Sequence, residues 1–112
     1  MRRDADRLHD IVEAIEAIDR HIQGGREAFE KDELVRVWCL RHLEVIGEAS
    51  ARLSETLRSR HPDVPWREII GMRNTLIHGY FDIDWEQVWN TLERDLPDLR
   101  RALEVMLKEQ DL

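Results

Sequence analysis

Side chains suited to phosphate and proton chemistry gather in the stretch RNTLIHGY, residues 73–80. The imidazole of His78 has an ordinary pKa of about 6.5, so it can take or give a proton at neutral pH. The guanidinium of Arg73 can hold two phosphate oxygens at once and stays charged. In RNA the 2′-hydroxyl already lies beside the phosphate, so cleavage needs little more than a base, an acid and a cation. These residue types therefore suit phosphodiester cleavage without a metal ion.

An ordinary structural role accounts for the same residues. His78 can interact with the negative end of its helix, and Arg73 can pair with Glu44 or Glu48. Tyr80 can fill the edge of a core. The spacing of Arg73 and His78 alone does not decide between the two interpretations, because an arginine five residues before a histidine arises by chance in many helices.

The geometry of a helix limits how Arg73 and His78 can meet. Five residues apart, they lie about 140° apart around a continuous helix. Gly79 offers one solution, since a glycine at a helix end lets the chain turn and bring His78 toward Arg73. A second copy of the chain offers another, with the arginine of one copy beside the histidine of the other.

Apolar residues recur every three or four positions along the chain, which predicts helices throughout. The first stripe should end near Gly24 and Gly25, and it consists of Leu8, Ile11, Ile15, Ile18 and Ile22. The second helix should start after the N-cap Asp32 and run to about Arg58. Its stripe is Val35, Cys39, Ile46, Ala49, Leu53 and Leu57.

Two further helices follow. Pro65 suits the first turn of a third helix, which Gly79 should end. Asp84 and Gln87 form a capping-box pattern for a fourth helix that continues to Met106, with a kink at Pro97. Because the connections are short, we expect an all-α, antiparallel four-helix bundle formed by one domain, residues 1–112.

Composition narrows the possible partners. The net charge is −7, which argues against a broad nucleic-acid-binding face, yet residues 31–80 carry eight basic and seven acidic side chains. No apolar run is long enough for a membrane span, and the single Cys39 fits a cytoplasmic protein and a small buried residue. The five histidines lack metal-ligand spacing, so we expect neither a metal nor a cofactor.

Several stretches together resemble the HepT-like branch of the HEPN superfamily. They are RHLEVIGEA at 41–49, PWREIIGMRNTLIHGYFDID at 65–84, and the later VW and DLPDLRRAL. The signature of that family, Arg-x-x-x-x-His-x-Tyr, is matched by Arg73, His78 and Tyr80. Asn74 matches the polar residue that follows the arginine.

The resemblance implies a helical homodimer in which the two motifs line one cleft. It implies a metal-independent RNA endonuclease, the toxin of a two-gene toxin–antitoxin system of type II or type VII-like organisation. Arg73 and His78 would be catalytic, and Asn74 would help to position the motif. The antitoxin would be a minimal nucleotidyltransferase that transfers AMP from ATP onto Tyr80, which would bring negative charge into the cleft and block RNA.

Charged residues of the second helix have two interpretations. Arg41, Glu44 and Glu48 lie one helical turn apart, as in ordinary surface ion pairs. Their place in the stretch that resembles the family suggests instead that the two glutamates orient Arg73 at the cleft. Both alternatives stay open at this point.

Other functions also remain possible. The chain can be a non-catalytic module that binds a nucleotide or a partner and serves as substrate of the nucleotidyltransferase, or a purely structural dimerisation domain. RNA cleavage by the unmodified protein separates the enzyme from both. Among the tryptophans, Trp66, Trp85 and Trp89 are expected in a core or interface, and Trp38 on a dimer surface.

Overall fold

The computed structural model describes residues 3–78 and 83–110, with their side chains except those of residues 73–78. The described chain contains only helices and their connections. The helices are α1 (Asp4–His21), α2 (Gly25–Lys31), α3 (Glu33–Ala51), α4 (Glu55–Arg60), α5 (Trp66–His78), α6 (Trp85–Asn90), the π-helical turn η1 (Thr91–Asp95) and α7 (Leu96–Gln110). The predicted all-α class is confirmed. None of the described helices is both long and apolar enough to cross a membrane.

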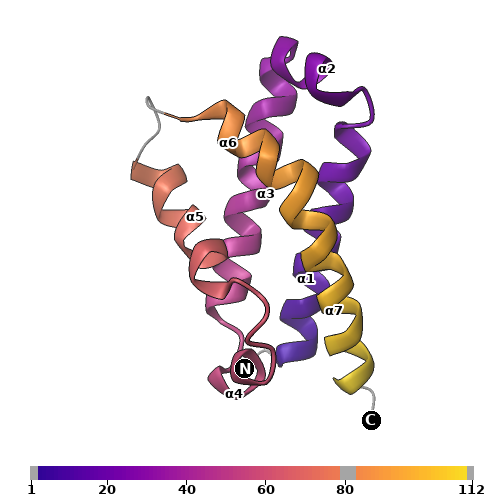
Figure 1. The fold of residues 1–112 in the computed structure, drawn as a ribbon, viewed down its shortest axis with the longest axis vertical. Coiled ribbons are helices and arrows are strands. Elements are labelled where there is room, and N and C mark those ends of the chain that lie inside the picture. Colours follow the sequence, from indigo (N-terminus) through magenta and orange to yellow (C-terminus); the bar gives the residue numbers. More distant parts are fainter. Residues whose placement is uncertain (1–2, 79–82, 111–112) are drawn as a thin grey trace.

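Four rods make up the bundle: α1, α3, α5 and the continuous α6–η1–α7 (Figure 1). Successive rods run in opposite directions, and α3 lies between α1 and α5, packing on both. The last rod, coloured orange to yellow, returns along α1. The predicted antiparallel arrangement of four rods is therefore confirmed.

One apolar core joins these elements. The predicted stripe of α1 is buried from Leu8 to Ile18, and the stripe of α3 is buried at Cys39, Leu43 and Ile46. The last rod adds its own buried residues, namely Val88, Trp89, Leu92, Leu96, Leu99, Leu103 and Met106. Because each stripe faces the same interior, burial of apolar surface holds the rods together.

The helix starts predicted from N-caps are confirmed. A carboxylate oxygen of Asp32 accepts hydrogen bonds from the backbone N–H groups of Leu34 and Val35, at 3.0 and 3.2 Å. Asp84 accepts from the backbone N–H of Gln87 at 3.1 Å. Such side chains satisfy backbone donors that have no partner inside the helix.

The predicted end of the second helix is wrong. We expected that helix to reach Arg58, but α3 ends at Ala51 and a separate helix, α4, begins at Glu55. Ser54 causes the break, because its Oγ accepts from the backbone N–H of Leu57 at 3.1 Å. The N–H and Oγ–H of Ser54 also donate to the carboxylate of Asp4, at 2.9 and 2.6 Å, which ties this corner to the start of α1.

The short helix α2 was not predicted. Gly25, with φ of +80°, makes the turn after α1 in a conformation that favours glycine. The seven residues of α2 then place Phe29 in the core, where it is 1% exposed. Instead of linking two rods directly, this segment covers one end of the bundle.

Three tryptophans lie in or against the core as expected, whereas the dimer surface expected for Trp38 stays a prediction. Trp66 and Trp89 are buried, Trp85 is partly buried against the core, and Trp38 is 42% exposed. Cys39 is fully buried, and this burial raises the pKa of its thiol to about 11. A thiol in such surroundings behaves as a small apolar residue, as predicted.

Candidate active site

Helix α5 carries the residues of the motif. Its first turn is anchored by Trp66, whose indole N–H donates to the carbonyl oxygen of His61 at 3.1 Å, and by the buried Ile69. The helix continues without interruption through His78. Arg73, Asn74 and His78 therefore belong to one helix, whereas Gly79 and Tyr80 lie outside the described residues.

Arg73 and His78 occupy different sides of α5. At 100° per residue, position 73 lies within about 40° of Trp66 and Ile69, which are both buried. Position 78 lies about 140° away from position 73, and within about 20° of Gly71 and Arg67. Position 73 is thus on the same side of α5 as the buried Trp66 and Ile69, and position 78 is on the same side as Arg67.

The placement around α5 bears on the two routes by which the residues can meet. A turn within one chain depends on Gly79, which is outside the described residues. Pairing across two copies needs no departure from the helix that the structure shows up to His78.

The supporting residues predicted on α3 form ion pairs with residues three or four positions along the chain. The guanidinium of Arg41 lies 3.4 Å from a carboxylate oxygen of Glu44, and that of Arg52 lies 2.9 Å from Glu48. Pairs of this kind on a helix surface contribute about 0.5 kcal/mol or less. The Glu44 side chain of the first pair is 31% exposed. Orientation of Arg73 by Glu44 or Glu48 stays a prediction.

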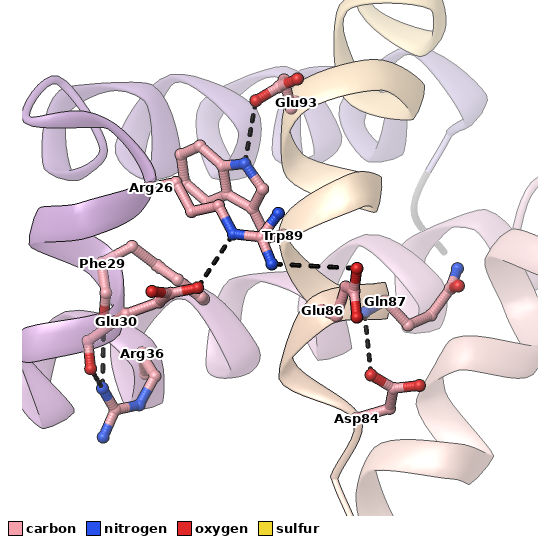
Figure 2. A network of polar contacts seen from close by, with 9 residues as sticks. All are labelled: Arg26, Phe29, Glu30, Arg36, Asp84, Glu86, Gln87, Trp89 and Glu93. Atoms are coloured by element: carbon pink, nitrogen blue, oxygen red, sulfur yellow. Dashed lines mark hydrogen bonds and ion pairs between the residues drawn. The ribbon is translucent and has the colours of Figure 1, made fainter.

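An aromatic cluster of Phe29, Trp85 and Trp89 lies at the start of α6, the element that follows the motif, and Figure 2 shows Phe29 and Trp89 of this cluster. The ring of Phe29 lies 5.2 Å from that of Trp89 and 6.1 Å from that of Trp85, measured between centroids. The guanidinium of Arg36 lies 5.2 Å above Trp85 and donates to the backbone carbonyl oxygens of Phe29 and Glu30. Aromatic and cation–π contacts of this kind hold α2, α3 and α6 together.

Ion pairs surround the same cluster. Arg26 bridges two helices, at 2.9 Å from Glu30 of α2 and 3.9 Å from Glu86 of α6. The indole N–H of Trp89 donates to Glu93 at 2.8 Å. The helix that carries the motif is thus anchored at Trp66, before the motif. The next helix, α6, is anchored by the contacts of Trp85 and Trp89. The sequence analysis did not identify Phe29 or Arg36 as parts of this cluster. The only signal was Phe29 itself, an aromatic residue among polar residues between two predicted helices.

Metal ligands do not gather in the described part of the chain. No group of three or more His, Cys, Asp or Glu side chains there is arranged to hold a metal ion. The residues with candidate chemistry are instead the arginine, histidine and tyrosine of the motif, which together suit phosphate binding and proton transfer.

Comparisons with known proteins bear on that chemistry. The family model "Ribonuclease HepT-like" matches residues 11–106. The chain is 39% identical over 108 residues to a protein of Thermococcus cleftensis named "Probable ribonuclease HepT", covering 96% of this chain and 98% of that protein. It is 35% identical over 104 residues to a "Putative RNase" of Caldanaerobacter subterraneus subsp. tengcongensis, covering 92% and 93%.

A third relative, a "Putative RNase" of Methanocaldococcus jannaschii, is 35% identical over 98 residues, covering 88% of this chain and 84% of that protein. No solved structure matches the chain. The family model spans nearly all of the bundle, from α1 to α7. The chain therefore belongs to the HepT-like ribonuclease family of the HEPN superfamily.

Proposed function

We propose that this protein is a metal-independent RNA endonuclease that acts as a homodimer. The observation that carries the proposal is the complete Arg73, His78 and Tyr80 motif, which begins on the continuous helix α5 of a chain in the HepT-like ribonuclease family. The relatives named as ribonucleases support the same activity. RNA is the substrate, and no metal takes part.

The proposed reaction uses the 2′-hydroxyl of the substrate. His78 removes the proton of that hydroxyl while its oxygen attacks the adjacent phosphorus, and the bond from phosphorus to the 5′-oxygen breaks. A proton delivered to the leaving oxygen from water completes the step and leaves a 2′,3′-cyclic phosphate. Arg73 holds the non-bridging oxygens as negative charge develops, and Asn74 positions the motif.

The site is composite, with Arg73 of one protomer beside His78 of its partner. The separation of about 140° around α5 supports this arrangement, because one helix does not turn both residues toward the same phosphate. An exposed apolar patch on α3 supports association between copies. In this patch Leu34 is 82% exposed, Val37 50% and Trp38 42%. Exposed apolar residues gathered in this way are typical of protein interfaces.

Tyr80 is the proposed point of control. A minimal nucleotidyltransferase antitoxin transfers AMP from ATP to the Tyr80 hydroxyl oxygen and releases pyrophosphate. The added phosphate and nucleotide place negative charge where RNA phosphates bind, which blocks the nuclease. On this proposal the protein is a cytoplasmic toxin of a two-gene toxin–antitoxin pair. Intact-mass measurement after incubation with the neighbouring enzyme and ATP should show AMP additions, and Tyr80→Phe should abolish them.

Replacement of the histidine tests the nuclease directly. His78→Ala should lower RNA cleavage about 10²-fold or more while leaving the helical CD spectrum unchanged. His9→Ala is the matched control, since His9 is exposed on α1 and far in sequence from the motif. An all-deoxy oligonucleotide of the same sequence should remain uncut by the wild type, because it lacks the attacking hydroxyl. If His78→Ala retains full activity, the assignment of His78 fails, and if the unmodified wild type cuts no RNA, the non-catalytic module becomes the better account.

A further inference from the structure

An open groove lies between α4 and the first half of α5, outside the residues of the motif. Its volume is about 740 Å³. Its walls are formed by Glu55, Arg58, Ser59, Trp66, Arg67, Ile70 and Gly71. A Cβ atom added at Gly71 would meet no described atom within 4 Å, so space is open beside the backbone of α5 at this point.

Two arginines give the groove its charge. Arg67 is exposed, and it makes no hydrogen bond or ion pair with any residue that the structure describes. Arg58 is partly buried, and its Nε is buried without a hydrogen-bond partner in the described part of the chain. Glu55 is the single carboxylate among the lining residues. The groove thus has a net positive charge in a chain whose net charge is −7.

The groove is aligned with the motif along α5. Arg67 and Gly71 lie within about 20° of position 78 around the helix axis, and Asn74 lies within about 40°. Arg67 is eleven residues before His78, which corresponds to about 16 Å along the helix. A strand that passes His78 on this side of α5 therefore continues over Arg67 toward Arg58.

The other side of α5 has the opposite charge. A cavity of about 410 Å³ there separates α5 from η1 and α7, and its lining includes four carboxylates: Asp63, Glu68, Asp95 and Asp98. Of these, Asp98 pairs with Arg101, whereas the other three have no ion-pair partner in the described part of the chain. Phosphate groups are repelled on that side, so only the Arg58 and Arg67 side suits a nucleic acid.

We infer that the groove binds the backbone of single-stranded RNA beyond the cleavage point, with Arg58 and Arg67 each neutralising one phosphate. The inference rests on the proposed nuclease function and extends it to an additional binding site. Trp66 is buried, so the groove offers no exposed aromatic ring for stacking with bases. Phosphate contacts without base contacts predict binding that depends on salt and little on sequence.

The test measures binding separately from cleavage. In a His78→Ala background, the affinity for a single-stranded RNA oligonucleotide is titrated between 50 and 200 mM salt, with and without Arg58→Gln and Arg67→Gln. Each lost phosphate contact should reduce the slope of log K against log salt by about 0.7. Across that salt range the parent should lose about sevenfold more affinity than the double variant. Arg60→Gln is the control, because Arg60 is exposed on α4 and does not line the groove.

The possible outcomes separate this inference from the function on which it rests. If the protein with His78 intact cleaves RNA but Arg58→Gln and Arg67→Gln change the slope no more than Arg60→Gln, the groove is not the binding site and the nuclease stands. If the slope falls as expected but no RNA is cut, the groove is supported and the nuclease is refuted. Absence of any RNA binding overturns both.

Discussion

The opposite placement of Arg73 and His78 around α5 predicts that each catalytic site is shared between two chains. A chain carrying Arg73→Ala and a chain carrying His78→Ala should each be inactive alone. In a hybrid dimer of the two, one site loses both residues and the other keeps both. Activity should therefore reappear when the two inactive chains associate.

The expected activities follow from the geometry of α5 and from the two-fold symmetry of a dimer. A helix with its side chains is about 10 Å across, so residues about 140° apart face phosphates on different sides of α5. Each single variant should lose about 10²-fold or more in rate. Random association of equal amounts makes half of the dimers hybrids, each with one intact site of two. The mixture should recover about a quarter of wild-type activity.

The assay uses two affinity tags. Co-expressed chains with different tags are purified in sequence, which isolates the hybrid, and it should show about half of wild-type activity on a fluorescent RNA. A hybrid of His78→Ala with the double variant Arg73→Ala/His78→Ala is the control and should stay inactive. If the first hybrid is no more active than its parents, Arg73 and His78 act within one chain and the composite site is wrong.

Three further predictions concern stability and reactivity. Ser54→Ala removes the cap of α4 and the bonds to Asp4, so the free energy of unfolding should fall by about 1–2 kcal/mol in urea titrations; no change would mean that this corner is not a stabilising contact. Phe29→Ala should cost about 3–5 kcal/mol in the same measurement, whereas a loss below about 1 kcal/mol would show that α2 does not seal the core. Burial raises the pKa of Cys39 from 9.0 to about 11. A disulfide reagent at pH 8 should therefore modify this thiol slowly until the protein unfolds, and stability should decline as pH rises from 9 toward 11, because the folded state retains the thiol proton over that range. Fast modification of the folded protein would contradict the burial.

The sequence predicted those parts of the fold that depend on neighbouring residues. The spacing of apolar residues in α1, and the caps Asp32 and Asp84, involve positions within a few residues of one another. Such signals need no knowledge of the rest of the chain. The position of the motif on α5 was predictable for the same reason.

The second helix was predicted to end near Arg58 but ends at Ala51, and this difference shows the limit of the apolar spacing as a signal. Leu53 and Leu57 continue the apolar spacing of α3, so the pattern gives no sign of a break. Ser54 caps α4 three residues before Leu57, and the bonds that tie this corner to the bundle reach Asp4, fifty positions earlier in the chain. The short helix α2 was missed because its seven residues contribute one buried side chain, too few for a periodic pattern.

The candidate site was predictable in its residue types but not in its surroundings. The angle between Arg73 and His78 follows from their spacing, whereas the residues that surround them come from other elements. The groove beside Arg67 requires α4 to lie against α5, and that placement follows from the unpredicted break after Ala51.

The carboxylate-lined cavity beside α5 has a consequence for how a polyanion approaches the molecule. At physiological ionic strength, electrostatic fields extend about 8 Å, which is less than the width of one helix. Attraction on one flank of α5 and repulsion on the other therefore remain distinct instead of cancelling. If RNA binds the groove as inferred, a flexible chain of phosphates arriving from solution is turned toward that flank before any base is contacted, and charge selects its direction of entry.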